Sequence, residues 1–310
     1  MFQGMEYVYE VYKTRSFSRA AQNLYISQPS LSATIKKIEN RIGTPLFDRS
    51  TTPIQLTECG KEYIRSMEKI MDIESGFENY LNDFNELKTG HIAIGGSNLY
   101  TSFVLPPLLT RFTQRFPAVN IRLEEADSAQ LKKRLFAGIL DLVIDNSQLD
   151  PNVYQCHRYQ SEHLLLAVPP CFASNTAAKS YLLTREDILS SRFLEDSVPC
   201  VPLSLFSREP FLFLRSGNDT RQRAERICQL WNFQPRVVLK LDQQITAFNL
   251  SCFGMGCSFV SDTLIRTLPR NVEMCYYKLP LQEARREIYF SKKKNRYITR
   301  AMEEFLKLTL

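Results

Sequence analysis

The spacing of apolar residues near the start of the chain predicts three helices. The first is expected over residues 2–13, and the second begins behind Ser18, which is placed to cap its N-terminus. The third opens with Ser27 as its cap and Pro29 in its first turn, where a missing N–H costs little. Gly43 is placed to end it. The second and third helices are separated by a turn too short to hold another element.

The outer face of the third helix carries short polar side chains instead of the Glu and Lys of an ordinary solvated helix. These residues are Gln28, Ser30, Ser32 and Thr34, followed by the pair Lys36-Lys37. Short hydroxyl and amide side chains at the start of a helix suit close approach to a DNA groove, and lysines one turn later would lie near phosphates. A polar surface helix in a helical hairpin is the commoner state of such a pattern. This face alone leaves both interpretations open.

The residues after Gly43 predict a wing beside this hairpin. Leu46 and Phe47 supply apolar side chains for an adjacent core, and residues 50–53 read as a turn before a short strand over 54–56. Arg49 is placed to contact phosphate or the minor groove. A strand–turn–strand unit beside such a hairpin favours DNA binding.

Many fixed spacings in the first sixty residues agree with one known signature. They are Ala20-Ala21-x-x-Leu24, Ser27-Gln28-Pro29-Ser30-Leu31-Ser32, Ile35, Ile38-Glu39, Ile42-Gly43, Leu46-Phe47-x-Arg49 and Leu56-Thr57-x-x-Gly60. Together they resemble the N-terminal signature of the LysR-type transcriptional regulators. The resemblance implies a winged helix-turn-helix domain over residues 1–58, with the helix-turn-helix at about 17–36. The residues expected to contact double-stranded DNA are Ser18, Ser27, Gln28, Pro29, Ser30, Ser32, Thr34, Lys36 and Arg49.

A single long helix is predicted over residues 57–88, with Thr57 as its N-cap and no proline to interrupt it. Its apolar residues follow a heptad period through Tyr63, Met67, Ile70, Phe77, Leu81 and Phe84. The sequence contains no other long helical pattern to cover this seam, so we expect it to pack against a second copy in a homodimer. The linker helix implied by the family resemblance agrees with this. A homotetramer is implied by the resemblance alone.

Strands and helices alternate from residue 91 onward, which predicts a mostly parallel α/β sheet in two lobes. Strands are expected over 91–95, 120–124, 141–145, 163–168, 211–214, 237–241, 257–260, 273–279 and 287–291, and the clearest helices over 128–137, 218–231, 244–253 and 297–308. The family resemblance continues, more loosely, through Phe103-x-Leu105-Pro106, Arg115-Phe116-Pro117, Leu135-x-x-Gly138-x-x-Asp141-Leu142 and Gly254-x-Gly256.

The predicted fold class is therefore α+β multidomain, with a periplasmic-binding-protein-like effector domain over residues 91–310. Lobe I is expected at 91–161 and 268–310, and lobe II at 162–267. The cationic run at 292–296 is expected in a solvated turn between strand and helix.

Polar side chains gather where strands of both lobes are expected to end. They are Ser97, Asn98, Thr101, Ser102, Ser128 and Asn146 in lobe I, and Ser216, Asn218 and Thr220 in lobe II. Ligands of open α/β sheets collect at such ends, and hydroxyls, amides and helix N-termini can cradle a carboxylate. Each cluster can also be an ordinary N-cap, and its convergence on one interlobe cleft is implied by the resemblance. We expect a small-molecule effector there, an anionic metabolite.

Composition limits the classes of function that the chain can have. A net charge of +6 over 310 residues permits nucleic acid without requiring it. No apolar run spans a bilayer and no secretory signal is visible, which predicts a cytoplasmic protein without membrane contact. Eight cysteines without paired C-x-x-C sets, and only three histidines, predict no metal or other cofactor.

We find no nucleophile elbow, phosphate loop or metal set, so an enzyme is not expected. One alternative is a redox-responsive regulator that uses Cys200, because LEDSVPC loosely resembles the surroundings of the sensing cysteine in peroxide-responsive members of the family. The other is a solute-binding module, which would explain only the second half of the chain.

Overall fold

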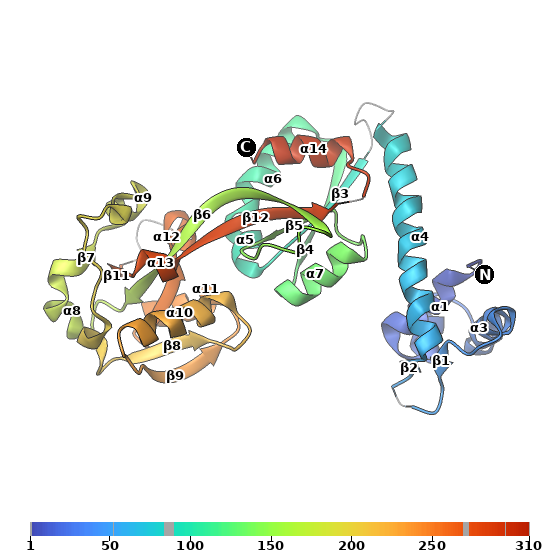
Figure 1. Cartoon of the computed structure of the whole chain (residues 1–310), viewed down its shortest axis with the longest axis horizontal. Helices are drawn as coiled ribbons and strands as arrows, with labels where there is room; N and C mark the ends of the chain where they lie inside the picture. The colour runs from blue at the N-terminus through green and yellow to red at the C-terminus, as the bar shows by residue number, and fades with distance from the viewer. Residues whose placement is uncertain (1, 52, 84–89, 269–272, 295, 310) are drawn as a thin grey trace. The chain divides into compact units, whose positions relative to one another are not determined.

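The computed structural model describes residues 2–51, 53–83, 90–268, 273–294 and 296–309 (Figure 1). It divides into two compact units, an N-terminal unit of Met1–Leu81 and a C-terminal unit of Asn82–Leu310. Within the described ranges, no helix is long and apolar enough to cross a membrane.

The N-terminal unit is a helix-turn-helix with a two-stranded wing. Its elements are α1 (Met5–Thr14), α2 (Phe17–Asn23), α3 (Gln28–Ile42), β1 (Phe47–Asp48), β2 (Gln55–Leu56) and α4 (Glu58–Asp83). Leu31 and Ile35 of α3 are fully buried in the core of this unit. Strands β1 and β2 pair antiparallel, with Phe47 opposite Leu56. The predicted winged fold is present.

Short-range chemistry explains where these helices begin and end. The Ser27 hydroxyl accepts the Ser30 N–H, and Gly43 ends α3 at φ 81°, a left-handed conformation that glycine adopts without strain. The expected cap at Ser18 is wrong. Ser16 caps α2 instead, because Phe17 is buried as the first helical residue and Ser18 falls inside the first turn.

Helix α4 begins as predicted, since the Thr57 hydroxyl accepts the Gly60 N–H at 3.0 Å. The first residues of the expected dimer seam are already buried in their own unit: Met67 is fully buried, and Tyr63 stacks on Phe2 with ring centroids 5.0 Å apart. Further along the helix, Phe77 of the seam is 62% exposed, and Ile73, which the predicted seam did not include, is 72% exposed. The Leu81 side chain and Phe84 lie outside the described part of the chain.

The C-terminal unit is built on one mixed sheet of ten strands among the described residues. The strands are β3 (Gly90–Gly96), β4 (Val119–Glu125), β5 (Leu142–Asp145), β6 (Tyr154–Val168), β7 (Leu182–Leu183), β8 (Pro210–Leu214), β9 (Arg236–Leu241), β10 (Cys257–Ser261), β11 (Cys275–Lys278) and β12 (Arg285–Lys293). Their order is β4-β3-β5-β12-β6-β10-β8-β9, with β11 also beside β6, and β7 beside β11.

Helices cover this sheet and connect its strands. They are α5 (Asn98–Phe103), α6 (Leu105–Arg115), α7 (Ser128–Phe136), α8 (Ser174–Ala177), α9 (Arg185–Leu189), α10 (Asp219–Leu230), α11 (Gln244–Cys252), α12 (Asp262–Thr267), α13 (Leu281–Ala284) and α14 (Arg300–Lys307). In lobe I, Phe305 of α14 packs edge-on against Phe112 and Phe290. In lobe II, Phe259 packs against Phe211 and Phe213.

Two long strands, β6 and β12, run antiparallel to each other and join the lobes (Figure 1). Their register pairs Arg285 with His163 at one end and Lys293 with Tyr154 at the other. The second half of β6 then pairs with β10 of lobe II and with β11, and β11 also pairs with β7 of lobe II, although the expected limits placed its residues in lobe I. Within the two βαβαβ runs, β3, β4 and β5 pair in parallel and so do β8, β9 and β10, as predicted. The pairings made by β6, β11 and β12 are antiparallel, so the sheet as a whole is mixed.

The length of β12 corrects one further expectation. Lys292 and Lys293 belong to this strand, and Lys292 is only 3% exposed. Burial lowers the pKa of Lys292 below its usual range, as expected when an ammonium group loses water. The prediction of a solvated turn over 292–296 is therefore wrong for its first two residues, which belong to β12.

Candidate functional site

The face of α3 predicted to contact DNA is open to solvent. Ser27, Gln28, Pro29, Ser30 and Lys36 are exposed, and so is Ser18 on α2. Ser32 and Thr34 are half-buried, and the Thr34 hydroxyl is donated to the Ser30 carbonyl at 2.9 Å. The early residues of α3 thus present short polar groups to solvent, and Lys36 is exposed further along the same helix.

Glu39 has a role that the sequence did not reveal. Its Oε1 accepts the N–H groups of Leu46 at 2.8 Å and Phe47 at 3.3 Å, and its Oε2 accepts Arg49 Nη2 at 2.9 Å. Arg49 also lies over the Phe17 ring at 5.2 Å. A buried carboxylate on α3 therefore fixes the first strand of the wing. Arg49, predicted only as a DNA contact, has a structural role in this unit.

A cavity of about 880 Å³ lies between the lobes of the C-terminal unit. It is lined from lobe I by residues at the ends of β3, β4 and β5, and from lobe II by residues that follow β8 and β9. Six of the nine predicted effector residues line it, namely Ser97, Ser128, Asn146, Ser216, Asn218 and Thr220. We call this cavity the interlobe cleft.

Three predicted residues do not line the cleft. Asn98 donates its amide to Glu125 Oε2 at 3.2 Å, and Thr101 is buried with its hydroxyl close to the Ser97 and Asn98 carbonyls. Ser102 is exposed on α5 outside the cleft. The reason is helical geometry: Leu99 and Tyr100 are the residues of α5 that line the cleft, and Asn98, Thr101 and Ser102 lie on other sides of this short helix.

An ionic network in the cleft floor was missed in the sequence. Arg286 of β12 donates from Nε to Glu162 Oε1 at 2.6 Å and from Nη1 to Asp219 Oδ2 at 2.9 Å. Tyr100 donates its hydroxyl to the same Glu162 oxygen at 2.8 Å. Arg286 is 5% exposed and Glu162 is fully buried. Residues 162 and 286 meet through the register of β6 and β12, which no local sequence pattern encodes.

The charges of this network support one another. Burial alone would lower the pKa of Arg286, but Glu162, and then Tyr100 and Asp219, raise it above its ordinary value. Burial alone would raise the pKa of Asp219, but Arg286 and Arg223 hold it below its ordinary value. The Arg286 guanidinium and the Asp219 carboxylate are therefore ionised together at neutral pH.

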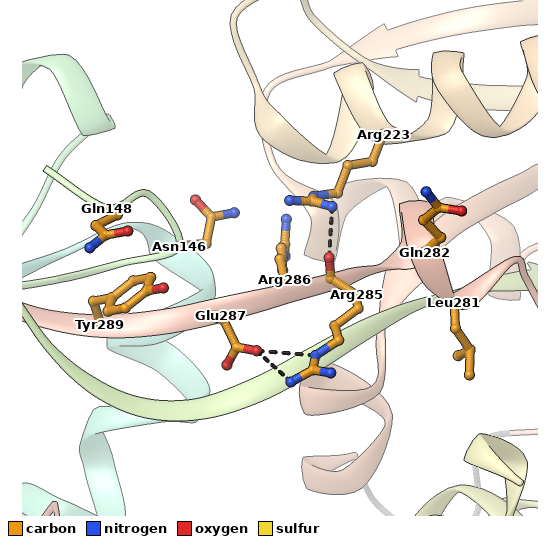
Figure 2. A pocket seen from close by; sticks show the side chains of 9 residues that line it. All are labelled: Asn146, Gln148, Arg223, Leu281, Gln282, Arg285, Arg286, Glu287 and Tyr289. Carbon is orange, nitrogen blue, oxygen red and sulfur yellow. Dashed lines mark hydrogen bonds and ion pairs between the residues drawn. The ribbon is translucent and has the colours of Figure 1, made fainter.

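The network also joins the two lobes directly. Asn146 of lobe I donates its amide to Asp219 Oδ2 of lobe II at 2.9 Å. Asn146 and Arg286 also line a second cavity of about 400 Å³ (Figure 2). There Arg223 donates from Nη1 to the Arg285 carbonyl at 2.7 Å, so α10 is tied to β12.

The Cys200 thiol does not have the character of a reactive site. Cys200 is half-buried, and its burial raises the pKa of the thiol above the ordinary value, although Lys278 partly offsets this. A reactive thiol requires the opposite shift. Cys228, the next cysteine along the chain, is buried and its pKa is raised to about 12, mainly by burial.

Known proteins share both units. Residues 2–61 match the model of the bacterial regulatory helix-turn-helix protein, lysR family, and residues 85–310 match the LysR substrate binding domain. An uncharacterized HTH-type transcriptional regulator of Bacillus subtilis (strain 168), YcgK, is 30% identical over 312 residues, which covers 98% of this chain and 92% of the relative.

Solved structures show the same fold. A variant of full-length OxyR from Pseudomonas aeruginosa has a TM-score of 0.68 at 17% identity, covering 98% of this chain and 92% of that chain. Full-length CbnR complexed with its target DNA has a TM-score of 0.64 at 16% identity, covering 100% of this chain and 98% of that chain.

Proposed function

The chain belongs to the LysR-type, DNA-binding transcriptional regulators, and we propose that a small molecule in the interlobe cleft controls how a dimer occupies its DNA site. The observation that carries this proposal is the cleft itself, a cavity of about 880 Å³ lined by both lobes. A ligand can shift a two-state domain only by its different affinity for the two states. Contacts from both lobes supply such a difference when the lobes move.

The N-terminal unit is proposed to read DNA with the exposed start of α3. We propose that Gln28 and Ser32 reach base edges and that Lys36 reaches phosphate; Gln28 and Lys36 are exposed and Ser32 is half-buried, which supports this. Gln28→Ala should then relax sequence preference by about 1–3 kcal/mol, as the loss of a base contact does. Lys36→Ala should weaken binding similarly on all sequences and reduce the salt slope by about one.

Fluorescence anisotropy on a specific and a random duplex, at several salt concentrations, separates these effects. Lys69→Ala on α4 is a matched control, because Lys69 is an exposed lysine outside α3. Equal losses on both duplexes for Gln28→Ala and Lys36→Ala would show that α3 does not read bases in this way.

Assembly as a dimer is proposed through α4. Ile73 and Phe77 expose large apolar side chains there, and an apolar helix face in water favours association. CbnR has been solved with its target DNA, and it shares this fold. Paired helix-turn-helix units would read two half-sites whose spacing follows from the dimer geometry.

The effector role of the cleft is tested by substitutions that leave the DNA-binding unit untouched. Asn218→Ala and Ser97→Ala remove side chains that line the cleft from opposite lobes. Both variants should lose the ligand response while basal DNA binding persists. Ser102→Ala is the matched control, since Ser102 is an exposed α5 serine outside the cleft.

The measurement is the length of the DNase footprint with and without effector, after a thermal-shift screen of metabolites has found a binder. A binder raises the apparent stability of the folded state. If both cleft variants respond like the wild type and like Ser102→Ala, the effector acts elsewhere.

A further inference from the structure

The charges around the interlobe cleft identify the chemical class of its ligand. We propose that the effector carries a protonated amine or guanidinium group, held by the carboxylates of lobe I; this assignment rests on the proposed effector role of the cleft. It replaces the anion that polar loops alone suggested. The argument starts from the charged residues that line the cavity, which are Glu125, Asp127, Asp145, Asp219, Asp242, Arg215 and Arg286.

Both arginines of the cleft lining are already paired with carboxylates. Arg215 Nη1 lies 3.2 Å from Asp242 Oδ1 at the exposed rim. Arg286 is held between Glu162 and Asp219, and Asp219 is shared with Arg223. These two groups are close to neutral. The remaining lining charges are Glu125, Asp127 and Asp145, all on lobe I, and among the described residues no Lys or Arg besides the paired Arg215 and Arg286 lines the cleft.

The partners of these three carboxylates are uncharged. Glu125 accepts the Asn98 amide and the Thr101 hydroxyl. Asp127 accepts the Gln130 N–H at 2.8 Å. Asp145 is buried and accepts the Asn146 N–H at 2.8 Å and the Ser147 hydroxyl at 3.1 Å. Burial raises the pKa of Asp145 above its ordinary value, and these hydrogen bonds and the charge of Arg286 offset this only in part. Hydrogen bonds from neutral donors do not cancel the charge of a carboxylate, so a cationic group in the cleft would be attracted where an anionic group would be repelled.

The helix ends that could attract an anion are occupied by the chain itself. Asp127 is the N-cap of α7, so its carboxylate already occupies the positive end of that helix. Asp219 lies in the first turn of α10 and does the same there. An anionic effector would have to compete with these carboxylates at both helices.

The same carboxylates are unsuited to a metal ion. In the described part of the chain, no group of three or more Asp, Glu, His or Cys side chains is arranged to hold one. Separated carboxylates around a cavity of about 880 Å³ fit an organic molecule that is larger than a metal ion and carries a cationic group. An amine or guanidinium also supplies several N–H donors, which match carboxylate acceptors.

The test uses the full-length chain and linear probes of matched length that differ only in their end groups: alkane diamines, amino acids with a terminal amine, and alkane dicarboxylates. Arginine, polyamines and common phosphorylated metabolites extend the panel. Thermal shift finds binders, and calorimetry measures their Kd. Amine-bearing probes should bind, and Asp145→Asn should weaken them about tenfold or more, as the loss of a charged hydrogen-bond partner does.

Two variants protect this test against a folding defect. Glu125→Gln removes a charge from an exposed position and should also weaken the amine probes. Asp150→Asn is the matched control, because Asp150 is an exposed lobe I aspartate outside the cleft lining. It should leave Kd unchanged.

The outcomes separate this assignment from the effector role itself. Binders that are all carboxylates or phosphates, sensitive to Asn218→Ala but unweakened by Asp145→Asn, would overturn the amine assignment and keep the cleft as the effector site. A panel in which no binder of any charge responds to Asn218→Ala would overturn the effector role of the cleft, and the amine assignment with it.

Discussion

The buried ion pair between Arg286 and Glu162 gives a quantitative prediction. Replacing Arg286 with Met keeps a long side chain but removes the positive charge 2.6 Å from Glu162. Breaking a buried ion pair by removing one partner costs about 3–5 kcal/mol, because the other charge stays buried without compensation. Asp219 keeps Arg223 as a partner, so most of this cost comes from Glu162. We expect a loss of unfolding free energy in that range at neutral pH.

The loss should depend on pH in a defined direction. Without Arg286, the folded-state pKa of Glu162 should rise above its unfolded value, because its buried carboxylate has lost its cation. The folded state then binds more protons than the unfolded state, so stability falls as pH rises and recovers as pH drops. The Glu162→Gln/Arg286→Met double variant should return to within about 1–2 kcal/mol of the wild type, since no unpaired charge remains.

Urea unfolding followed by tryptophan fluorescence measures these effects. The chain has one tryptophan, Trp231, directly after α10, and α10 begins with the Asp219 of the network. Arg285→Met is the matched control, because Arg285 is the exposed neighbour on the same strand and should cost no more than about 1 kcal/mol. The reasoning fails if Arg286→Met is as mild as this control, or if the double variant is no better than the single one.

Three further predictions concern the other parts of the chain. Glu39→Gln should remove the ion pair with Arg49. Glu39→Ala should also speed hydrogen exchange at the Leu46 and Phe47 amides, because these donors lose their acceptor. NMR exchange rates check both variants. Ile73→Asp should shift sedimentation toward monomer at micromolar concentration while Lys69→Asp does not, and a dimer in both would refute the α4 interface. Cys200→Ser should respond to peroxide like the wild type in gel shifts, because burial raises the pKa of this thiol.

The parts of the fold that were predictable from sequence are those fixed by neighbouring residues. The limits of α3 follow from Ser27 at its start and Gly43 at its end, both of which act within a single turn. The N-cap of α2 was misplaced by two residues, because Ser16 and Ser18 are equally good caps. The choice is made by the burial of Phe17 against the wing, including its edge-on packing on Phe47.

The parts that were not predictable depend on pairing across long sequence distances. Strand β6 begins nine residues earlier than expected. The sequence pattern missed residues 154–162 because they mix polar with apolar side chains and are buried to different degrees. The ionic network in the floor of the cleft was not predictable for the same reason, because Arg286 and Glu162 are brought together only by the register of β6 and β12. Sequence located the polar loops around the cleft, but the charge of the cleft depends on which residues are neutralised by partners elsewhere in the chain.

The arrangement of contacts indicates which of them an effector can exchange. The Arg286–Glu162 pair lies between the two crossing strands and is buried, so breaking it would cost about 3–5 kcal/mol. The Asn146 amide on Asp219 joins the lobes directly and faces the cleft, and a hydrogen bond to a charged group contributes only about 1.5–3 kcal/mol. A ligand amine held by the lobe I carboxylates, which include Asp145 next to Asn146, would displace this weaker contact without breaking the buried pair. We therefore expect effector binding to move the lobes by exchanging this contact, with the β6–β12 pair kept intact as the hinge.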